Sequence, residues 1–355
     1  MSKKNHNPQN TVIEFPNMNE ISIICEAAPL VIVDHNVFRL YPEIFHKNNH
    51  LIIHGEKEKD SSRLFSILKR LSELGLNRND VLLSVGGGVT TDIGGFAASI
   101  FHRGIKSAYI PTTVTAITDA SQGGKTAINN SGIKNVCGSY YFPDSIYINF
   151  NFLDTLSSSE IEDGITETVK HAVLSGSVFF TKLENFIFSK EWSDITTGNL
   201  LPSESAGFNE IAVDSYTYKQ EIVAIDPFEN GIRKILNLGH TVGHALETQS
   251  EMKLPHSRAV ASGLIIELFI LEKIFSADYS HFTEPLFKFF KNLNSVSLDN
   301  LLYEIALKDK KAVNKKIMIS CPSFTDSANY TVECDKELFF DSVVRYNKKL
   351  KTKNI

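Results

Sequence analysis

The feature that most restricts the fold is an apolar run that leads through three glycines into a helical segment. The run Val81–Val85 is followed by Gly86, Gly87 and Gly88, and a helical pattern continues to Phe96. Glycines let backbone N–H groups approach an anion, and the N-terminus of the following helix adds partial positive charge. The segment therefore predicts a strand, loop and helix that could hold a pyrophosphate. A tight turn with close helix packing is the alternative, because the spacing is not the usual GxGxxG.

The rest of the first half repeats this alternation of strand and helix. Leu30–Val33, Leu51–Ile53 and Ala108–Ile110 are short β-branched runs, and Ser61–Leu74 has apolar residues at helical spacing. Such alternation predicts βαβ units around a parallel sheet. We therefore expect the first half to form a nucleotide-binding layer.

The second half has a helical pattern. It begins near Ser157, where serines followed by Glu160 are typical of a helix N-terminus. A chain of 355 residues exceeds the size at which one core keeps growing, so two domains are expected. The predicted division is a flexible tail over residues 1–12, an α/β domain over 13–158 and a helical domain over 159–355.

Composition excludes several classes of protein. Thirty-six basic and 41 acidic residues give a net charge of −5, which offers no field for nucleic acid. The four cysteines form no CxxC, so neither a disulfide framework nor a thiolate zinc site is expected. Charged residues interrupt the long apolar stretch Ala259–Ala277, which predicts a buried helix rather than a membrane span. We expect a cytoplasmic protein with no signal peptide.

Polar side chains follow the first of the predicted strands. Asp34 and Asn36 come directly after Leu30–Val33. At the carboxyl edge of a parallel sheet, such short side chains can bind ribose hydroxyls. Taken alone, they are more typical of a turn.

Three titratable side chains share one face of a predicted helix. In Asn237–Glu247, His240, His244 and Glu247 stand at i, i+4 and i+7. A single histidine on such a face is usually a satisfied core residue. Two histidines followed by an acid favour a metal or acid–base site as much as they favour a core role.

Two further segments add candidate ligands. His256 supplies another imidazole, while Glu167 and Lys170 share a helical face at i and i+3. The alternative for the second pair is a surface ion pair. Two imidazoles and one carboxylate with an open position suit Zn²⁺ acting as a Lewis acid. The spacing leaves open which two histidines would bind it.

A series of short motifs follows one another over roughly Val31 to Ile319. Together they resemble the 3-dehydroquinate synthases, a family of sugar-phosphate cyclases, and the ordered series is more specific than any one motif. The matching residues are Gly86-Gly87-Gly88 with Asp92, Pro111-Thr112-Thr113, Asp119 with Gly123-Gly124-Lys125-Thr126, Lys134-Asn135, Glu167-Thr168-Val169-Lys170, Asn237 with His240 and His244, and finally His256.

The resemblance implies an α/β N-terminal Rossmann-like domain, an all-α C-terminal domain, a homodimer, bound NAD⁺ and one divalent metal, zinc or cobalt. It implies that Glu167, His240 and His256 are the metal ligands, which leaves His244 to contact phosphate or to support the ligands. The implied cofactor contacts are Asp34, Asn36, Glu56, Lys59, Gly87, Gly88, Asp92, Thr112, Thr113, Asp119, Lys125, Lys134 and Thr155.

The resemblance also implies the reaction and its residues. The substrate would be 3-deoxy-D-arabino-heptulosonate 7-phosphate, converted to 3-dehydroquinate and phosphate in the shikimate pathway of aromatic amino-acid biosynthesis. The steps would be transient oxidation by NAD⁺, phosphate elimination, re-reduction and aldol closure. The implied catalytic residues are Asp119, Lys125, Lys170, Lys219, Arg233, Asn237 and His244, and the implied substrate contacts are Arg103 from the neighbouring subunit, Lys125, Asn135, Lys219, Arg233, Asn237, His244 and Lys310, with Lys311 as the alternative to Lys310.

One position departs from the family pattern. The family reads His-Gly-Glu after the last ligand, whereas this chain has Ser257 and Arg258 after His256. A cyclase acting on another sugar phosphate, such as sedoheptulose 7-phosphate, is therefore an alternative. A metal-dependent polyol dehydrogenase and a non-enzymatic binding paralogue are further alternatives.

Overall fold

The structure is a computed structural model that describes residues 8–46, 49–290, 293–297, 300–307, 316–322, 325 and 329–353. The chain divides into two compact units. The first comprises Met1–Ile161 and Asp194–Phe228, and the second Glu162–Ser193 and Glu229–Ile355. The segment Asp194–Phe228 thus returns to the first unit, a feature that the sequence did not indicate.

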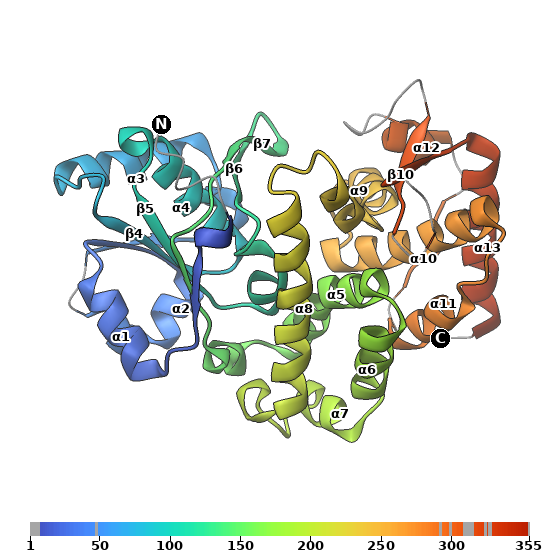
Figure 1. Cartoon of the computed structure of the whole chain (residues 1–355), viewed down its shortest axis with the longest axis horizontal. Coiled ribbons are helices and arrows are strands. Elements are labelled where there is room, and N and C mark those ends of the chain that lie inside the picture. The colour runs from blue at the N-terminus through green and yellow to red at the C-terminus, as the bar shows by residue number, and fades with distance from the viewer. Residues whose placement is uncertain are drawn as a thin grey trace. The chain divides into compact units, whose positions relative to one another are not determined.

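A parallel sheet forms the centre of the first unit, and two of its strands, β4 and β5, are labelled in Figure 1. It has six strands in the order β1-β8-β5-β4-β2-β3. The four strands expected from the apolar runs are confirmed. In register, Val33 pairs with Val85 and Gly86 with Pro111, so β2, β4 and β5 end at one edge of the sheet. The bounds are β1 Val12–Glu14, β2 Leu30–Asp34, β3 His50–Ile53, β4 Val81–Gly86, β5 Lys106–Pro111 and β8 Ser145–Tyr147.

Helices cover both faces of this sheet, which explains why its strands are apolar throughout. Successive strand residues point to opposite faces. Ile32 accordingly packs in the core beneath α3 and α4, whereas Val31 and Val33 pack in the core on the side of α1. The bounds are α1 Met18–Ala27, α2 His35–Leu40, α3 Ser61–Glu73 and α4 Gly88–Ile100.

A hairpin and the returning helix complete the first unit. The antiparallel strands β6 (Lys125–Asn130) and β7 (Ile133–Tyr140) pack against α4, and α8 (Ala206–Ile225) packs against the π-helical turn η6 (Ala116–Ala120). Among the described residues, the chain also forms the 3-10 segments η2 Pro8–Asn10, η3 Pro42–Phe45, η4 Glu56–Glu58, η5 Phe101–Arg103, η7 Phe150–Thr155, η8 Pro202–Glu204 and η9 Ile232–Asn237. The sequence had predicted a flexible tail as far as residue 12, but η2 and the start of β1 lie within it.

The second unit is largely helical, and the all-α expectation needs one correction. Strands β9 (Ile317–Ser320) and β10 (Thr331–Cys334) form a small antiparallel sheet. The expected buried helix is confirmed as α10, whose residues 259–272 are all buried. None of the described helices is both long and apolar enough to cross a membrane. The helices are α5 Ser158–Ser175, which crosses the unit boundary, α6 Ser177–Ile187, α7 Lys190–Thr196, α9 His240–Gln249, α10 His256–Phe275, α11 Ser280–Phe289, α12 Asn300–Leu307 and α13 Lys336–Lys353.

Candidate active site

A cavity of about 460 Å³ opens at the carboxyl edge of the parallel sheet. Its volume lies in the range of small-molecule sites, and its place is where α/β sheets bind nucleotides. The lining combines backbone from the glycine loop with short polar side chains from several strand ends. Seven predicted cofactor residues line it, namely Asp34, Asn36, Gly87, Gly88, Thr112, Thr113 and Thr155.

The glycine loop brings backbone close to this cavity. Gly86 has a φ of 158°, and a Cβ there would lie 2.6 Å from the hydroxyl of Thr90. Gly87 is the N-cap of α4 and offers no capping side chain. The first N–H groups of a helix have no intrahelical partner, so a pyrophosphate at Gly87 and Gly88 would accept from them.

Asp34 has two contacts that fix its orientation. Its Oδ1 accepts hydrogen bonds from the backbone N–H groups of Asn36 (2.8 Å) and Val37 (3.4 Å), which caps α2. Because Asp34 also lines the cavity, its carboxylate is held in place before any ligand arrives.

A buried lysine connects three other predicted residues. The Nζ of Lys59 donates to Asp92 Oδ2 at 2.5 Å and to Asn135 Oδ1 at 2.6 Å. Asn129 extends the network, since its amide donates to Glu56 Oε1 at 2.7 Å and its Oδ1 accepts from the backbone of Asn135. The structure thus joins Glu56, Lys59, Asp92 and Asn135 into one polar cluster.

Burial raises the pKa of Asp92 to about 6, although Lys59 lowers it. In the unfolded chain the group titrates near 4, so between these values the folded protein binds more protons. Stability attributable to Asp92 therefore falls as pH rises from 4 to 6. We compare the free energy of unfolding of the wild type with that of Asp92→Asn, which lacks this titrating group. The wild-type value minus the variant value should fall by on the order of 2 kcal/mol between pH 4 and 7. Urea titrations across this range measure it, and a difference that grows with pH would contradict it.

A second lysine is held against the π-helical turn. Lys219, on α8, lies 2.7 Å from Asp119 Oδ1 and donates to the Asp119 carbonyl at 2.7 Å. The other predicted cations of the first unit are exposed. Lys125 begins β6, Lys134 lies on β7, and Arg103 ends η5 with a φ of 65°.

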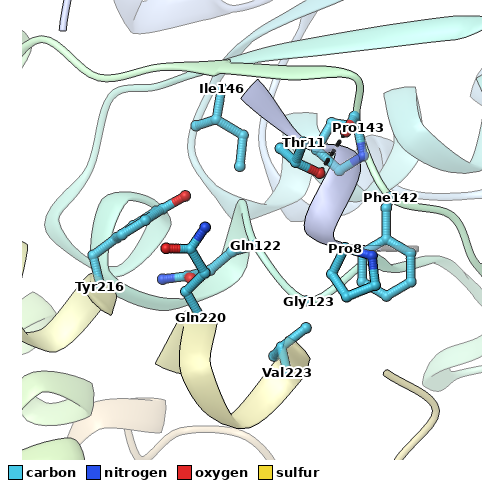
Figure 2. A pocket seen from close by; sticks show the side chains of 10 residues that line it. All are labelled: Pro8, Thr11, Gln122, Gly123, Phe142, Pro143, Ile146, Tyr216, Gln220 and Val223. Atoms are coloured by element: carbon cyan, nitrogen blue, oxygen red, sulfur yellow. Dashed lines mark hydrogen bonds between the residues drawn. The ribbon is translucent and has the colours of Figure 1, made fainter. Parts of the chain in front are cut away.

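A smaller cavity lies beside the loop that leads to Lys125 (Figure 2). Gln122, Tyr216 and Gln220 line it. Thr11 and Pro143 also line it and lie next to each other, and the Thr11 hydroxyl donates to the Pro143 carbonyl at 2.7 Å. Its volume of about 20 Å³ accommodates one water molecule and no substrate.

The second unit brings the three predicted metal ligands together. Oε1 of Glu167, on α5, lies 3.4 Å from Nε2 of His240 and 3.7 Å from Nε2 of His256. Ligand atoms about 2.1 Å from one tetrahedral metal are separated by about 3.4 Å. The spacing of the three side chains therefore fits one small divalent cation.

The rings of His240 and His256 are each oriented by a contact of Nδ1, the nitrogen that does not face Glu167. Nδ1 of His240 lies 3.3 Å from the Leu238 carbonyl, and Nδ1 of His256 lies 3.2 Å from Glu247 Oε2. Because both partners only accept, these contacts call for the proton at Nδ1. Nε2 is then the atom of each ring that remains to bind a metal, next to Glu167. Burial lowers the pKa of His256, but Glu167 and Glu247 raise it to about 10, so a metal bound there would displace a proton from Nε2.

Lys170 forms a buried ion pair with Oε2 of Glu167. The alternative of a surface ion pair is therefore wrong. Burial alone would raise the pKa of Glu167, but Lys170, His240 and His256 hold it well below its usual value. The pKa of His240 is lowered, first by burial and then by Lys170. An ionised carboxylate and a neutral imidazole are the forms that bind a metal.

His244 belongs to a second group of possible ligands. Its ring centroid is 5.3 Å from that of His240, and ligand atoms of His244, Glu247 and His256 lie within 4.8 Å of one another. The sequence had left open which histidines would bind a metal, and the geometry contains both sets. Glu247 was noted on the helical face but not assigned a role, and it holds His256.

Two of the remaining predicted residues of this unit, Arg233 and Asn237, lie on η9. Arg233 is buried, and the amide of Asn237 donates to Glu229 Oε1 at 2.5 Å. Lys310 and its alternative Lys311 lie outside the described residues.

The position that departs from the family pattern forms a specific contact. The Ser257 hydroxyl donates to Asp163 Oδ1 at 2.6 Å. Asp163 and Glu167 are four residues apart on α5, and Ser257 follows His256 on α10. The serine thus links two ligand-bearing helices, while Arg258 is partly exposed.

Family comparisons agree with the two-part organisation. The family model for the 3-dehydroquinate synthase N-terminal region matches residues 49–163, and that for the C-terminal region matches residues 164–312. A 3-dehydroquinate synthase of Pyrococcus furiosus is 38% identical over 81% of this chain and 82% of its own. One of Parabacteroides distasonis is 38% identical over 72% of this chain and 71% of its own.

The chain belongs to the 3-dehydroquinate synthase family. Membership confirms the resemblance and the expected class of enzyme. The fold of this 3-dehydroquinate synthase family member is shared with 2-epi-5-epi-valiolone synthase of Streptomyces hygroscopicus, solved with NAD⁺ and Zn²⁺ bound. That structure has a TM-score of 0.78, 20% identity and 96% coverage of each chain.

Proposed function

We propose that this chain converts 3-deoxy-D-arabino-heptulosonate 7-phosphate to 3-dehydroquinate and phosphate, using NAD⁺ and one divalent metal. The observation that carries the proposal is the convergence of Glu167, His240 and His256 in a member of this family. The alternative of a degenerate paralogue would give no reason for retaining all three ligands with their Nε2 atoms turned inward.

The first unit would hold the dinucleotide. Gly87 and Gly88 would donate backbone N–H groups to the pyrophosphate, and Asp34, which caps α2, would accept from ribose hydroxyls. NAD⁺ would supply a reversible hydride acceptor, so that a transient ketone acidifies the C–H whose loss expels phosphate. Lys59 holds Asp92 and Asn135 in fixed positions beside this chemistry.

The second unit would hold the metal. A divalent cation there would act as a Lewis acid toward substrate hydroxyl oxygens. Lys170 keeps Glu167 ionised, and Glu247 orients the ring of His256 through its Nδ1. These contacts fix the donor set before substrate binds, which favours a well-defined orientation of the reacting carbons.

Cationic and amide donors would bind the two anionic groups of the substrate. We assign the phosphate to Lys125, Asn135, Asn237, His244 and Lys310. Arg233 would bind the carboxylate through its planar fork of donors. The ion pair of Asp119 with Lys219 would orient the reacting hydroxyls. We leave proton abstraction in the elimination to the departing phosphate itself.

Product analysis tests the proposal. Incubation of the purified chain with the seven-carbon acid phosphate, NAD⁺ and Zn²⁺ or Co²⁺ should release phosphate and a carbocycle in equal amounts. NADH should not accumulate, because each cycle regenerates NAD⁺. Conversion of sedoheptulose 7-phosphate instead would indicate a related cyclase, and net NADH formation would indicate a polyol dehydrogenase.

We further propose a cytoplasmic homodimer in which Arg103 contacts the substrate of the neighbouring subunit. The family resemblance supports this arrangement, and exposure of Arg103 leaves it accessible to a partner. Light scattering would measure the molar mass, and a monomer that is fully active would contradict the proposal.

A further inference from the structure

Helix α10 carries a buried carboxylate that contacts the start of another helix. Glu267 is fully buried, and its Oε2 accepts from the backbone N–H of Gly239 at 2.7 Å while its Oε1 accepts from that of Val242 at 3.0 Å. These two donors flank His240, the first residue of α9. A carboxylate of α10 thus binds the turn that presents a predicted metal ligand.

The start of α9 has no capping side chain of its own. Its N-cap is Gly239, in the left-handed conformation with a φ of 82°. The first N–H groups of a helix need acceptors, and a negative charge there is favoured by the helix dipole. Glu267, which lies 28 residues after Gly239 in the chain, supplies both the acceptors and the negative charge.

Helices α9 and α10 also pack so closely that their backbones have no room to shift toward each other. A Cβ added to Gly263 would lie 2.1 Å from the carbonyl oxygen of Gly239 and 2.7 Å from the backbone nitrogen of Gly243. The backbone on both sides of His240 is therefore packed directly against α10. If the Glu267 contacts are lost, the turn at Gly239 that carries His240 must therefore change its conformation.

We propose that Glu267 is a positioning residue that sets the metal affinity of the site through His240. The inference rests on the proposed function, since it assumes the metal held by Glu167, His240 and His256. Helix α10 then serves two ligands, because it begins with His256 and holds His240 through Glu267. Outer contacts of this kind change metal affinity by about 10- to 100-fold when they are removed.

Glu267→Gln tests the proposal. The amide retains one acceptor but turns an NH₂ group toward a backbone N–H, so the turn at His240 must shift. We expect the dissociation constant for Co²⁺ to rise about 10- to 100-fold, with altered ligand-field absorption bands. Affinity for NAD⁺, which we assign to the first unit, should stay unchanged.

Glu272→Gln is the matched control. Glu272 is a buried glutamate on the same helix, and its Oε1 accepts from the backbone of Tyr279, the N-cap of α11, at 2.9 Å. Its Oε2 pairs with Arg345. This variant should lose stability as Glu267→Gln does, yet bind Co²⁺ as wild type does with an unchanged spectrum.

Each outcome decides the matter. Equal Co²⁺ affinity and spectra in wild type and Glu267→Gln would overturn the inference while leaving the proposed function intact. If wild type itself binds no Co²⁺, the proposed function fails and the inference falls with it. If Glu267→Gln does not fold, Glu267→Asp provides the test, because the shorter carboxylate keeps its charge and should weaken Co²⁺ binding to a smaller extent.

Discussion

His256→Ala is expected to remove the metal and abolish turnover while NAD⁺ binding is retained. His256 is one of three predicted ligands, and its side chain is half-exposed, so its loss leaves little buried volume empty. Because losing an outer contact already weakens metal binding by about 10- to 100-fold, losing a ligand should weaken it by more than about 100-fold. Metal content after dialysis and phosphate release from the substrate measure the two effects.

His281→Ala serves as the control for this substitution. His281 is an exposed histidine near the start of α11, in the same unit. It should retain metal and activity. Full activity and metal content in His256→Ala would refute the ligand assignment and would favour a site without this residue.

Lys170→Met is expected to lower the free energy of unfolding by about 3–5 kcal/mol, the range found when one partner of a buried ion pair is removed. The carboxylate of Glu167 would stay buried without its cation. Its pKa should rise, because Lys170 is the strongest of the groups that lower it. Metal binding should then become weaker as pH falls. Urea unfolding of the metal-free protein and metal titration at several pH values measure these effects.

An exposed ion pair of the same unit provides the comparison. Lys253 lies 2.9 Å from Glu251, and both side chains are 79% exposed. Lys253→Met should leave stability almost unchanged, because solvent screens such pairs. Equal stability of the Lys170 and Lys253 variants would show that burial of the Glu167 pair carries no energetic consequence.

Local patterns were sufficient to predict the core of the first unit. The apolar runs at β2 and β4 can only be buried on both faces, and the glycines after β4 marked the turn into α4. Three features lay beyond such patterns. Strand β1 has three residues, the pairing of β9 with β10 joins short segments, and α8 returns to the first unit through contacts distant in sequence.

The candidate site was predictable only in part, because a ligand set depends on tertiary contacts. Helical spacing placed His240, His244 and Glu247 on one face, but it could not bring Glu167 to them. The ordered resemblance implied one of the two sets of side chains that the structure brings together. Contacts made through other helices, such as Ser257 with Asp163 and Glu267 with α9, had no signal in spacing, since neither belongs to a repeating pattern.

The position of Asp34 affects how readily a protein of this kind could evolve to use NADP⁺ in place of NAD⁺. Asp34 ends β2, caps α2 and lines the cavity assigned to NAD⁺. A carboxylate in that place repels the extra phosphate that distinguishes NADP⁺ from NAD⁺. Selection for NADP⁺ would therefore act on a residue that both caps α2 and is the proposed ribose contact. Asparagine or serine could retain the cap, and the first route to altered cofactor preference should pass through one of them.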